Sequence, residues 1–503
     1  MMNEASRVVS DAAVMKPRSS AQPRAHKIAL YGFGSEPVVH RNLIDLAAKA
    51  QSPLTWCAIL TMPHYRPVIG EVLPAGEILD VFRMLPRSPV GGDLGCLAHY
   101  CGSLVEDLAA QKRTRRQRNG RWRLNRGIDY YKLYKEFLVD RGATHVLTST
   151  IETPDAKILV AAAQELGLGV LVPLDMRNMT GSYFSTDCYE TPPAYAEANS
   201  KSRAQAAEFI HRFRENPTAA RGLPMEVTSG TKDTTLPAYL SPRWQRIKRF
   251  ATNAIERPDI FDPDQIRVAV MANVPLLRKT IRGVRERQNS AQFDIAHAEA
   301  LPKRFIFYPL QYSPEASINT PAPYFLDQMR VIDALRFAMP SDCELVVKEH
   351  PACMEMRPVK FMRRMRNVPG VTVIKGSVPS VEVIKRAALT VAVTGTAAFE
   401  AFLLGRPAIA LGRGLSSWAI GSMASMSYLR ARVLNAINEP VSDDFVIEQV
   451  AKLMSVRYAF LFTPPHVPGE PMLRLRNMQS FLSALLDHLE RESSQQLADQ
   501  PTA

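Results

Sequence analysis

Short apolar runs recur between residues 345 and 412, and each is rich in β-branched side chains. Each run has the length of a strand that is buried on both faces. Helical patterns at residues 381–388 and 397–404 fill two of the gaps between the runs. This alternation predicts βαβ units and therefore a parallel sheet. The predicted strands are residues 345–348, 371–375, 389–393 and 407–411.

The two helical patterns carry boundary signals. Ser380 and Thr396 stand where N-caps are expected, because Ser and Thr hydroxyls accept hydrogen bonds from the first free N–H groups of a helix. Gly405 stands where a helix commonly ends in a left-handed residue. We therefore expect each helix to begin directly after a strand end.

Small, hydroxyl and charged residues gather at the carboxyl ends of the four predicted strands. Ligands of parallel α/β sheets bind beyond these ends, so we expect one pocket there. The residues are Glu349, His350 and Pro351, then Gly376 and Ser377, then Thr394, Gly395 and Thr396, and finally Gly412.

The first half of the chain repeats the pattern less clearly. Gly34 belongs to a GxG that follows a predicted strand, and it allows either a close backbone approach to a ligand or a tight turn. Thr153 and Pro154 suit the start of a helix, and Gly167 suits its end. Glu152 is thereby expected at a strand's carboxyl end, facing a crevice. The predicted strands here are residues 27–31, 54–60, 145–149 and 170–174, with a helix at 41–49.

Residues 176–195 interleave aromatic and hydroxyl side chains with Asp187 and Glu190. This composition suits a sugar-binding loop or, equally, an ordered surface loop that is packed by its tyrosines.

The composition is that of a globular protein with 503 residues, 46% apolar and 22% charged, which is long enough for two or three domains. No apolar run reaches the length of a membrane span, and we expect no secretory signal at the N-terminus. The six cysteines lack zinc-ligand spacing, which favours reduced thiols in a cytoplasmic protein without a metal site.

A formal net charge of +13 calls for an anionic partner or an acidic surface. Residues 112–126, from Lys112 to Arg126, contain eight basic residues and no acid. A second cluster runs from Arg278 to Arg287. Anionic lipid headgroups suit both clusters, whereas a solvated loop or a groove for an acidic sugar polymer are the alternatives. We expect no nucleic-acid partner, and we expect a protein at the inner face of the cell membrane.

The pattern divides the chain into two Rossmann-like lobes with parallel sheets, joined by basic helices. The predicted parts are a disordered tail (1–26), an N-terminal lobe (27–215), a basic helical linker or insertion (216–302), a C-terminal lobe (303–465), a C-terminal helix (466–492) and a disordered tail (493–503).

Several phrases resemble the bacterial capsular polysaccharide synthesis family, which includes the Kdo transferases of capsule assembly. They are YPLQYSPEASINTPAPYFLDQ, LVVKEHP, SVEVIKRAALTVAVTGTAAFEAFLLGRPAIALG and, in the first half, SYFSTDCYETPPAY. The resemblance implies a GT-B glycosyltransferase, in which two Rossmann-like lobes face each other across a cleft. We expect it to be metal-independent, because the sequence has no obvious DxD pair near the predicted pocket. It implies a nucleotide-sugar donor, with CMP favoured, and no other cofactor.

The resemblance also assigns roles by position. His350 with Pro351 would contact the donor phosphate, as would Ser377 or Ser380. Thr394, Gly395 and Thr396 would complete the phosphate site, and Glu400 would hold a ribose. The structural alternatives are a core histidine for His350 and a tight turn for residues 394–396. For Glu400 the alternative is a residue on the polar face of an otherwise apolar helix.

Elementary chemistry supports a phosphate site, because a helix N-terminus with hydroxyls binds anions. His350 could stabilise the charge that develops on the leaving nucleotide. An inverting transfer also needs a base for the acceptor hydroxyl, and Glu152 is our choice before Asp187 and Glu190. Gln311 and Glu315 are further candidates for lining the cleft.

Three functions follow from this reading. The first is transfer of a sugar, such as the acidic sugar Kdo, onto a cell-surface polysaccharide or its lipid anchor. The second is a nucleotide-sugar 2-epimerase, which needs no acceptor. The third is a non-catalytic protein of capsule assembly.

Overall fold

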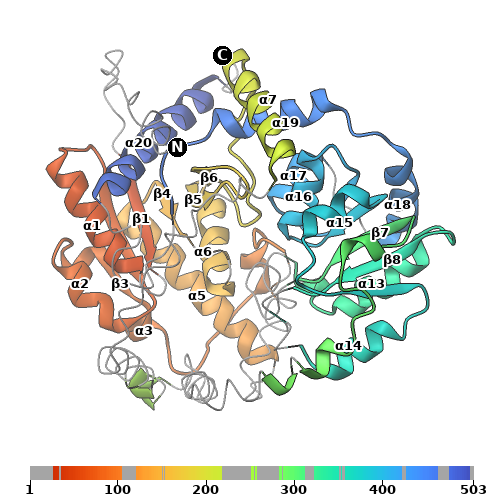
Figure 1. Ribbon diagram of the computed structural model, residues 1–503. Coiled ribbons are helices and arrows are strands. Elements are labelled where there is room, and N and C mark those ends of the chain that lie inside the picture. Colours follow the sequence, from red (N-terminus) through yellow and green to blue (C-terminus); the bar gives the residue numbers. More distant parts are fainter. Residues whose placement is uncertain are drawn as a thin grey trace, which may run out of the picture.

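The computed structural model contains two α/β sheets, one from each half of the chain (Figure 1). It describes residues 26–32, 36–102, 104, 120–149, 151, 153–217, 248, 251–253, 255–257, 283–285, 287–311, 322–350, 353, 357–421, 426–462 and 475–498.

The first sheet has six strands in the order β3-β2-β1-β4-β5-β6. The first five are parallel, and β6 runs antiparallel to β5. The chain builds outward from β1 to β3 and then starts again at β4 on the other side of β1, so the strand order reverses between β1 and β4. The strands are β1 (Lys27–Gly32), β2 (Thr55–Leu60), β3 (Ile78–Asp80), β4 (His145–Leu147), β5 (Gly169–Asp175) and β6 (Ser182–Ser185).

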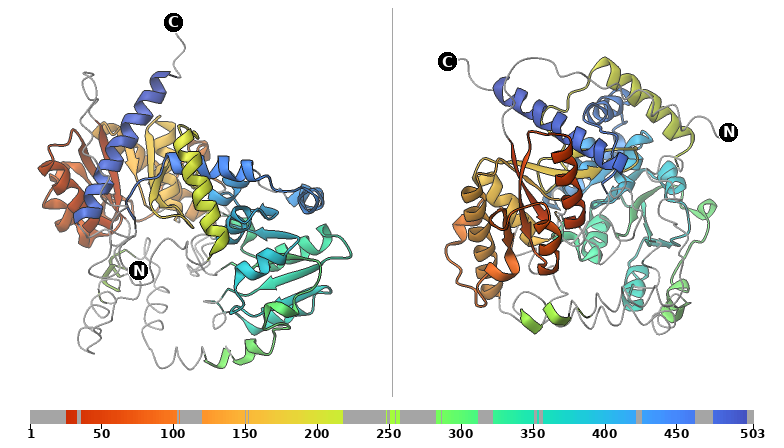
Figure 2. Two further views of the ribbon diagram at one scale, coloured as in Figure 1. Left: turned by 45° about the horizontal axis from the view of Figure 1, so that its top comes forward. Right: turned by 90° about the vertical axis from the view of Figure 1, so that its left-hand side faces the viewer.

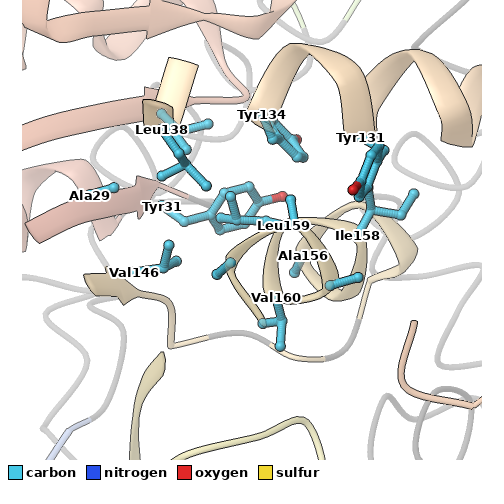
Figure 3. Packing of buried hydrophobic residues seen from close by; sticks show 14 of the residues in the cluster. Ala29, Tyr31, Tyr131, Tyr134, Leu138, Val146, Ala156, Ile158, Leu159 and Val160 are labelled. Atoms are coloured by element: carbon cyan, nitrogen blue, oxygen red, sulfur yellow. The ribbon is translucent and has the colours of Figure 1, made fainter. Parts of the chain in front are cut away.

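Alternate residues of β1 face opposite sides of this sheet. Ala29 and Tyr31 belong to the core under α5 and α6, whereas Ile28 and Leu30 belong to the core under α1 and α20. Figure 3 shows the Tyr31 ring among side chains of α5 and α6. The helices are α1 (Glu36–Lys49), α2 (Arg66–Gly70), α3 (Val81–Met84), α5 (Gly120–Arg141), α6 (Pro154–Glu165) and α20 (Leu475–Ala498), with short 3₁₀ turns η1 (Pro63–Tyr65), η2 (Ala75–Glu77) and η3 (Leu94–Leu97).

The second sheet has five parallel strands in the order β11-β10-β7-β8-β9. Its order reverses between β7 and β10 in the same way. One face is covered by α13, α14 and α18, and the other by α15 and α16. The elements are β7 (Phe305–Pro309), α13 (Gln328–Ala338), β8 (Glu344–Lys348), α14 (Val359–Arg366), β9 (Val371–Ile374), α15 (Ser380–Arg386), β10 (Leu389–Ala392), α16 (Thr396–Leu403), β11 (Ala408–Ala410) and α18 (Leu429–Asn438), with 3₁₀ turns η4 (Ala298–Ala300), η5 (Pro323–Phe325) and η7 (Met426–Tyr428).

The two halves are interlocked by segments that cross between them (Figure 2). Helix α7 (Ser200–Glu215) follows the first sheet in sequence but packs with α16, α17 (Leu415–Ile420) and α19 (Asp443–Ser455) in one apolar cluster. After α19 the chain returns to the first sheet, where Tyr458 exchanges two backbone hydrogen bonds with Ser182, of 2.8 and 3.0 Å. Helix α20 then packs on α1.

The predicted α/β class with two parallel sheets is confirmed. Each of the four strands predicted from residue 345 onward is present, with ends shifted by at most one residue. Gly405 has the expected left-handed conformation, with φ of +65°. The cap at Thr153 is also present, because its side chain accepts a hydrogen bond from the backbone N–H of Ala156.

Some boundary predictions are wrong. Pro379 and Gly395 occupy the N-cap positions of α15 and α16, so Ser380 and Thr396 are the first helical residues. Part of the predicted loop at 176–195 forms β6, and α20 continues to Ala498, past the predicted start of a disordered tail. The division into domains stays a prediction, and most of the linker at 216–302 lies outside the described residues.

Candidate functional site

The carboxyl ends of β7 and β10 flank the point where the strand order of the second sheet reverses. In open α/β sheets this is where ligands bind. Gln311 lies two residues after β7, and Thr394 and Gly395 follow β10. We call Gln311, Lys348, Glu349, His350, Ser380 and residues 394–396 the strand-end site.

Gly395 lies in close contact with Gln311. A Cβ atom at position 395 would be 2.9 Å from the Nε2 atom of Gln311 and 3.2 Å from its Oε1. Gln311 is only 6% exposed, and its backbone is held by Gln328, whose Oε1 accepts from the Gln311 N–H at 2.6 Å. A glycine at 395 therefore lets the amide of Gln311 lie against the start of α16.

A buried ion pair fixes the end of β8. The Glu349 carboxylate accepts two hydrogen bonds from Arg357, of 2.8 and 2.9 Å, and one from the backbone N–H of His350, of 2.7 Å. Arg357 also donates to the backbone oxygen of Gln311 at 3.0 Å. This network ties the loops after β7 and β8 together and orients the backbone at His350.

The end of β8 also places a cation at the start of α15. Lys348 is only 6% exposed, and its Nζ atom donates to the Ser380 hydroxyl at 2.7 Å. Ser380 is not the N-cap, because Pro379 before it has the extended backbone of that position. His350, two residues further on, is half-buried. Lys348 and His350 thus bring an ammonium group and an imidazole to the same strand end.

At the start of α16, the Thr396 hydroxyl donates to the Glu400 carboxylate at 3.1 Å, and Glu400 is 5% exposed. Ser377 is exposed in the turn after β9. The strand-end site therefore has a buried ammonium group at the start of α15, beyond β8, and the N–H groups that begin α16, beyond β10. Such an arrangement can bind an anion such as a phosphate.

The predicted residues of the other half are only partly described. Glu152 and Gly34, like Pro351 and Glu315, lie outside the described residues. Asp187 is occupied within its own loop, where it accepts hydrogen bonds from the backbone N–H of Tyr189 at 2.7 Å and from the Thr191 hydroxyl at 2.7 Å.

Glu190 links the loops of the two halves. Its carboxylate pairs with Arg177 and accepts a hydrogen bond from the backbone N–H of Leu415, at 3.2 Å, beyond β11. Next to it, the guanidinium of Arg413 lies 4.7 Å from the centre of the Tyr189 ring. The segment at 187–190 is therefore a contact between the halves as well as a candidate acceptor loop.

Sequence reasoning missed Glu36, which begins α1 at the reversal point of the first sheet. It is 2% exposed and accepts a hydrogen bond from the Ser149 hydroxyl, which follows β4. Asp155, in the first turn of α6, accepts a hydrogen bond from Tyr31, and burial raises the pKa of Tyr31 well above its ordinary value. The available signal for Glu36 was its place directly after the GxGS that follows β1.

A surface hollow of about 430 Å³ lies elsewhere, between α7 and α19. It is lined by Ile210, Arg214 and Asp443 among others, none of which follows a strand. The topology of the sheet, rather than the size of this hollow, identifies the candidate site.

Residues 267–459 match the family described as "Capsule polysaccharide biosynthesis protein". This span contains the whole second sheet and the strand-end site. The match confirms, for this part of the chain, the resemblance to the capsular polysaccharide synthesis family. No curated protein matches the chain.

The solved structures that match the chain include two kinds of enzyme. The β-Kdo 2,7-transferase KpsC of Thermosulfurimonas dismutans has 15% identity and a TM-score of 0.33, over 71% of this chain and 89% of that one. A putative UDP-N-acetylglucosamine 2-epimerase of Listeria monocytogenes has 13% identity and a TM-score of 0.24, over 93% of this chain and 97% of that one. At these values the likeness does not decide between the two reactions.

Within the described residues, no helix is long and apolar enough to span a membrane.

Proposed function

We propose that this protein is a glycosyltransferase of capsule synthesis that takes its sugar from a nucleotide donor held at the strand-end site. The observation that carries the proposal is the contact between Gln311 and Gly395 at the strand reversal point, with Lys348 buried at the neighbouring strand end. The family match over the same residues supports it.

In this proposal the donor phosphate lies at the start of α16. Its charge would be balanced by the ammonium group of Lys348 and by the N–H groups after Gly395. His350 would donate a hydrogen bond to the phosphate as the bond to the sugar breaks, and Glu400 would accept from the ribose hydroxyls. Ser377 is a weaker candidate, because its exposed turn lies at the far strand β9.

The acceptor would bind at the first sheet, where its hydroxyl needs a base. Glu36 joins Glu152 as a candidate, since it is a buried carboxylate that is hydrogen-bonded at the reversal point of that sheet. Asp187 and Glu190 would shape the acceptor loop rather than take the proton, because both oxygens of each carboxylate already accept hydrogen bonds.

We favour CMP as the nucleotide of the donor. The transferred group would be Kdo or another acidic sugar, and the acceptor would be a surface polysaccharide or its lipid anchor. No metal ion takes part in the proposed reaction. The two basic stretches, at 112–126 and 278–287, are proposed to contact an anionic membrane surface from the cytoplasmic side.

The test is a transfer assay with CMP-Kdo and with UDP-sugars, in the presence and absence of a glycan acceptor. Acceptor-dependent release of CMP is the expected result. Conversion of a UDP-sugar without an acceptor would identify an epimerase instead. Two results together would favour a non-catalytic role. The unaltered protein would show no turnover, and a variant with His350 and Glu36 replaced would still support capsule production.

A further inference from the structure

Three helices cover one face of the second sheet and turn their other sides outward. Met329, Met362 and Val433, one from each of α13, α14 and α18, belong to the same buried cluster. In Figure 1 these helices lie on the side of the second sheet away from α20 and the first sheet. We call their exposed residues the outer face.

The outer face is strongly basic. The sequences of α13, α14 and α18 contain eight Lys or Arg residues and a single acidic residue, Asp333. Asp333 is paired with Arg364, at 3.4 Å. The remaining excess of positive charge is therefore not balanced within these helices. The exposed basic residues are Arg330, Lys360, Arg363, Arg364, Arg366 and Arg430.

The segment that follows the second basic stretch adjoins this face. Arg366 donates to the backbone oxygen of Ala291 at 3.3 Å and pairs with Asp294 at 2.9 Å. Arg285 and Arg287, which belong to the stretch, are both exposed. Two exposed basic residues therefore precede, in sequence, the segment that contacts α14.

Two large aromatic side chains project from the outer face. Phe337, near the end of α13, is 84% exposed, and Tyr428, just before α18, is 73% exposed. The two helix ends are neighbours, because Arg430 donates to the backbone oxygen of Phe337 at 3.1 Å. A phenylalanine with this exposure leaves apolar area in water that a partner can bury.

The charges on α7 and α19 are arranged differently. Basic residues of α7 are paired across to α19, as in Arg203 with Glu448 at 2.8 Å and Arg214 with Asp443 at 2.6 Å. Arg203 and Arg214 thus have acidic partners on a neighbouring helix, which α13, α14 and α18 supply only to Arg364.

We infer that the outer face docks on the surface of an anionic lipid bilayer. Lys and Arg side chains would lie among the headgroups, and Phe337 and Tyr428 would enter the interfacial layer, where aromatic rings are favoured. A soluble polyanion would use the positive charge but would leave the projecting Phe337 without an apolar environment. The role of this docking rests on the proposed function, because a lipid-anchored acceptor would lie at such a surface.

The experiment measures binding of the full chain to phosphatidylglycerol-containing vesicles by co-sedimentation, with pure phosphatidylcholine vesicles for comparison. Each basic residue near the surface contributes about fivefold to binding. Lys360→Gln with Arg363→Gln should therefore weaken binding roughly 25-fold. Phe337→Ala should weaken it several-fold, and this loss should persist at high salt.

Matched controls on other surfaces separate docking from general charge. Lys201→Gln with Arg212→Gln on α7 removes the same charge, and Val139→Ala removes an apolar group that is 58% exposed on α5. Both variants should bind vesicles as the unaltered protein does. Unchanged thermal unfolding of all variants would show that the fold is kept.

Equal binding of the outer-face and control variants would overturn the inference. So would binding to a soluble anionic polymer such as heparin without binding to vesicles. Vesicle binding requires no sugar transfer, so this result and the transfer assay can fail independently.

Discussion

Glu349 and Arg357 form a bidentate ion pair whose side chains are 1% and 7% exposed. Arg357→Met would leave the carboxylate buried without its countercharge, and we expect a loss of about 3–5 kcal/mol in the free energy of unfolding. The double variant with Glu349→Met should be more stable than Arg357→Met. Urea unfolding measures both changes.

The exposed pair of Arg203 and Glu448 provides the control. Arg203→Met should cost less than about 1 kcal/mol, since an exposed pair is solvated in either case. Equal losses at positions 203 and 357 would show that the buried pair does not secure the strand ends.

Gly395→Ala should displace the amide of Gln311, because the added Cβ would lie 2.9 Å from Nε2. The backbone φ of −70° is open to alanine, so only packing opposes the change. We expect a loss of about 1 kcal/mol in unfolding free energy, near the lower end for overpacking, together with weaker nucleotide binding. Gly70→Ala, with no atom within 4 Å of the added Cβ, should leave nucleotide binding unchanged.

Glu36→Gln should lower the rate of sugar transfer by about 10²–10⁴-fold if this carboxylate is the base. Nucleotide binding should be unaffected, because Glu36 belongs to the other sheet. Steady-state kinetics and calorimetry together measure these effects. A normal rate in Glu36→Gln with a large loss in Glu152→Gln would assign the base to Glu152.

Stability should fall as the pH is lowered, partly through His488 on α20. Burial lowers the pKa of His488 to about 4, and its Nδ1 is hydrogen-bonded to the Tyr195 hydroxyl. The unfolded chain binds a proton near pH 6.5 and the folded chain only near pH 4. The protein therefore keeps the full contribution of His488 to its free energy of unfolding above pH 6.5, where the ring is neutral in both states. As the pH falls from 6.5 to 4, about 3 kcal/mol of this free energy is lost.

His488→Phe should flatten this acid limb, because the ring remains beside Phe184 but no longer titrates. The measurement is the free energy of unfolding between pH 4 and pH 7.5. The same change at His211, an exposed residue of α7, serves as the control. An acid limb that is as steep in His488→Phe as in the unaltered protein would contradict the assignment.

The second sheet could be predicted because its strands are buried on both faces. For example, the apolar run at 389–393 indicates a strand, Gly395 indicates a turn, and Thr396 indicates the start of a helix. The first half was harder, since α5 is polar over much of its surface and its buried face, with Ile128, Tyr131 and Tyr134, was not recognised. Strand β6 is short and lies in a segment rich in polar residues.

The contacts that organise the strand-end site depend on tertiary structure. No local pattern relates Gln311 to Gly395, or Arg357 to Glu349 across a loop. Position alone indicated His350 and residues 394–396 as candidates. Glu36 was missed because its partner Ser149 is 113 residues away.

The most direct test of the account is nucleotide binding at the strand-end site. Thermal unfolding with CMP, CDP, UDP, GDP and ADP would be compared for the unaltered protein, Lys348→Gln and, as a control on the exposed side of α15, Lys385→Gln. We predict that CMP at 100 times its dissociation constant adds about 2.7 kcal/mol in the unaltered protein and in Lys385→Gln but not in Lys348→Gln. No stabilisation by any nucleotide, or equal stabilisation of Lys348→Gln, would contradict the account.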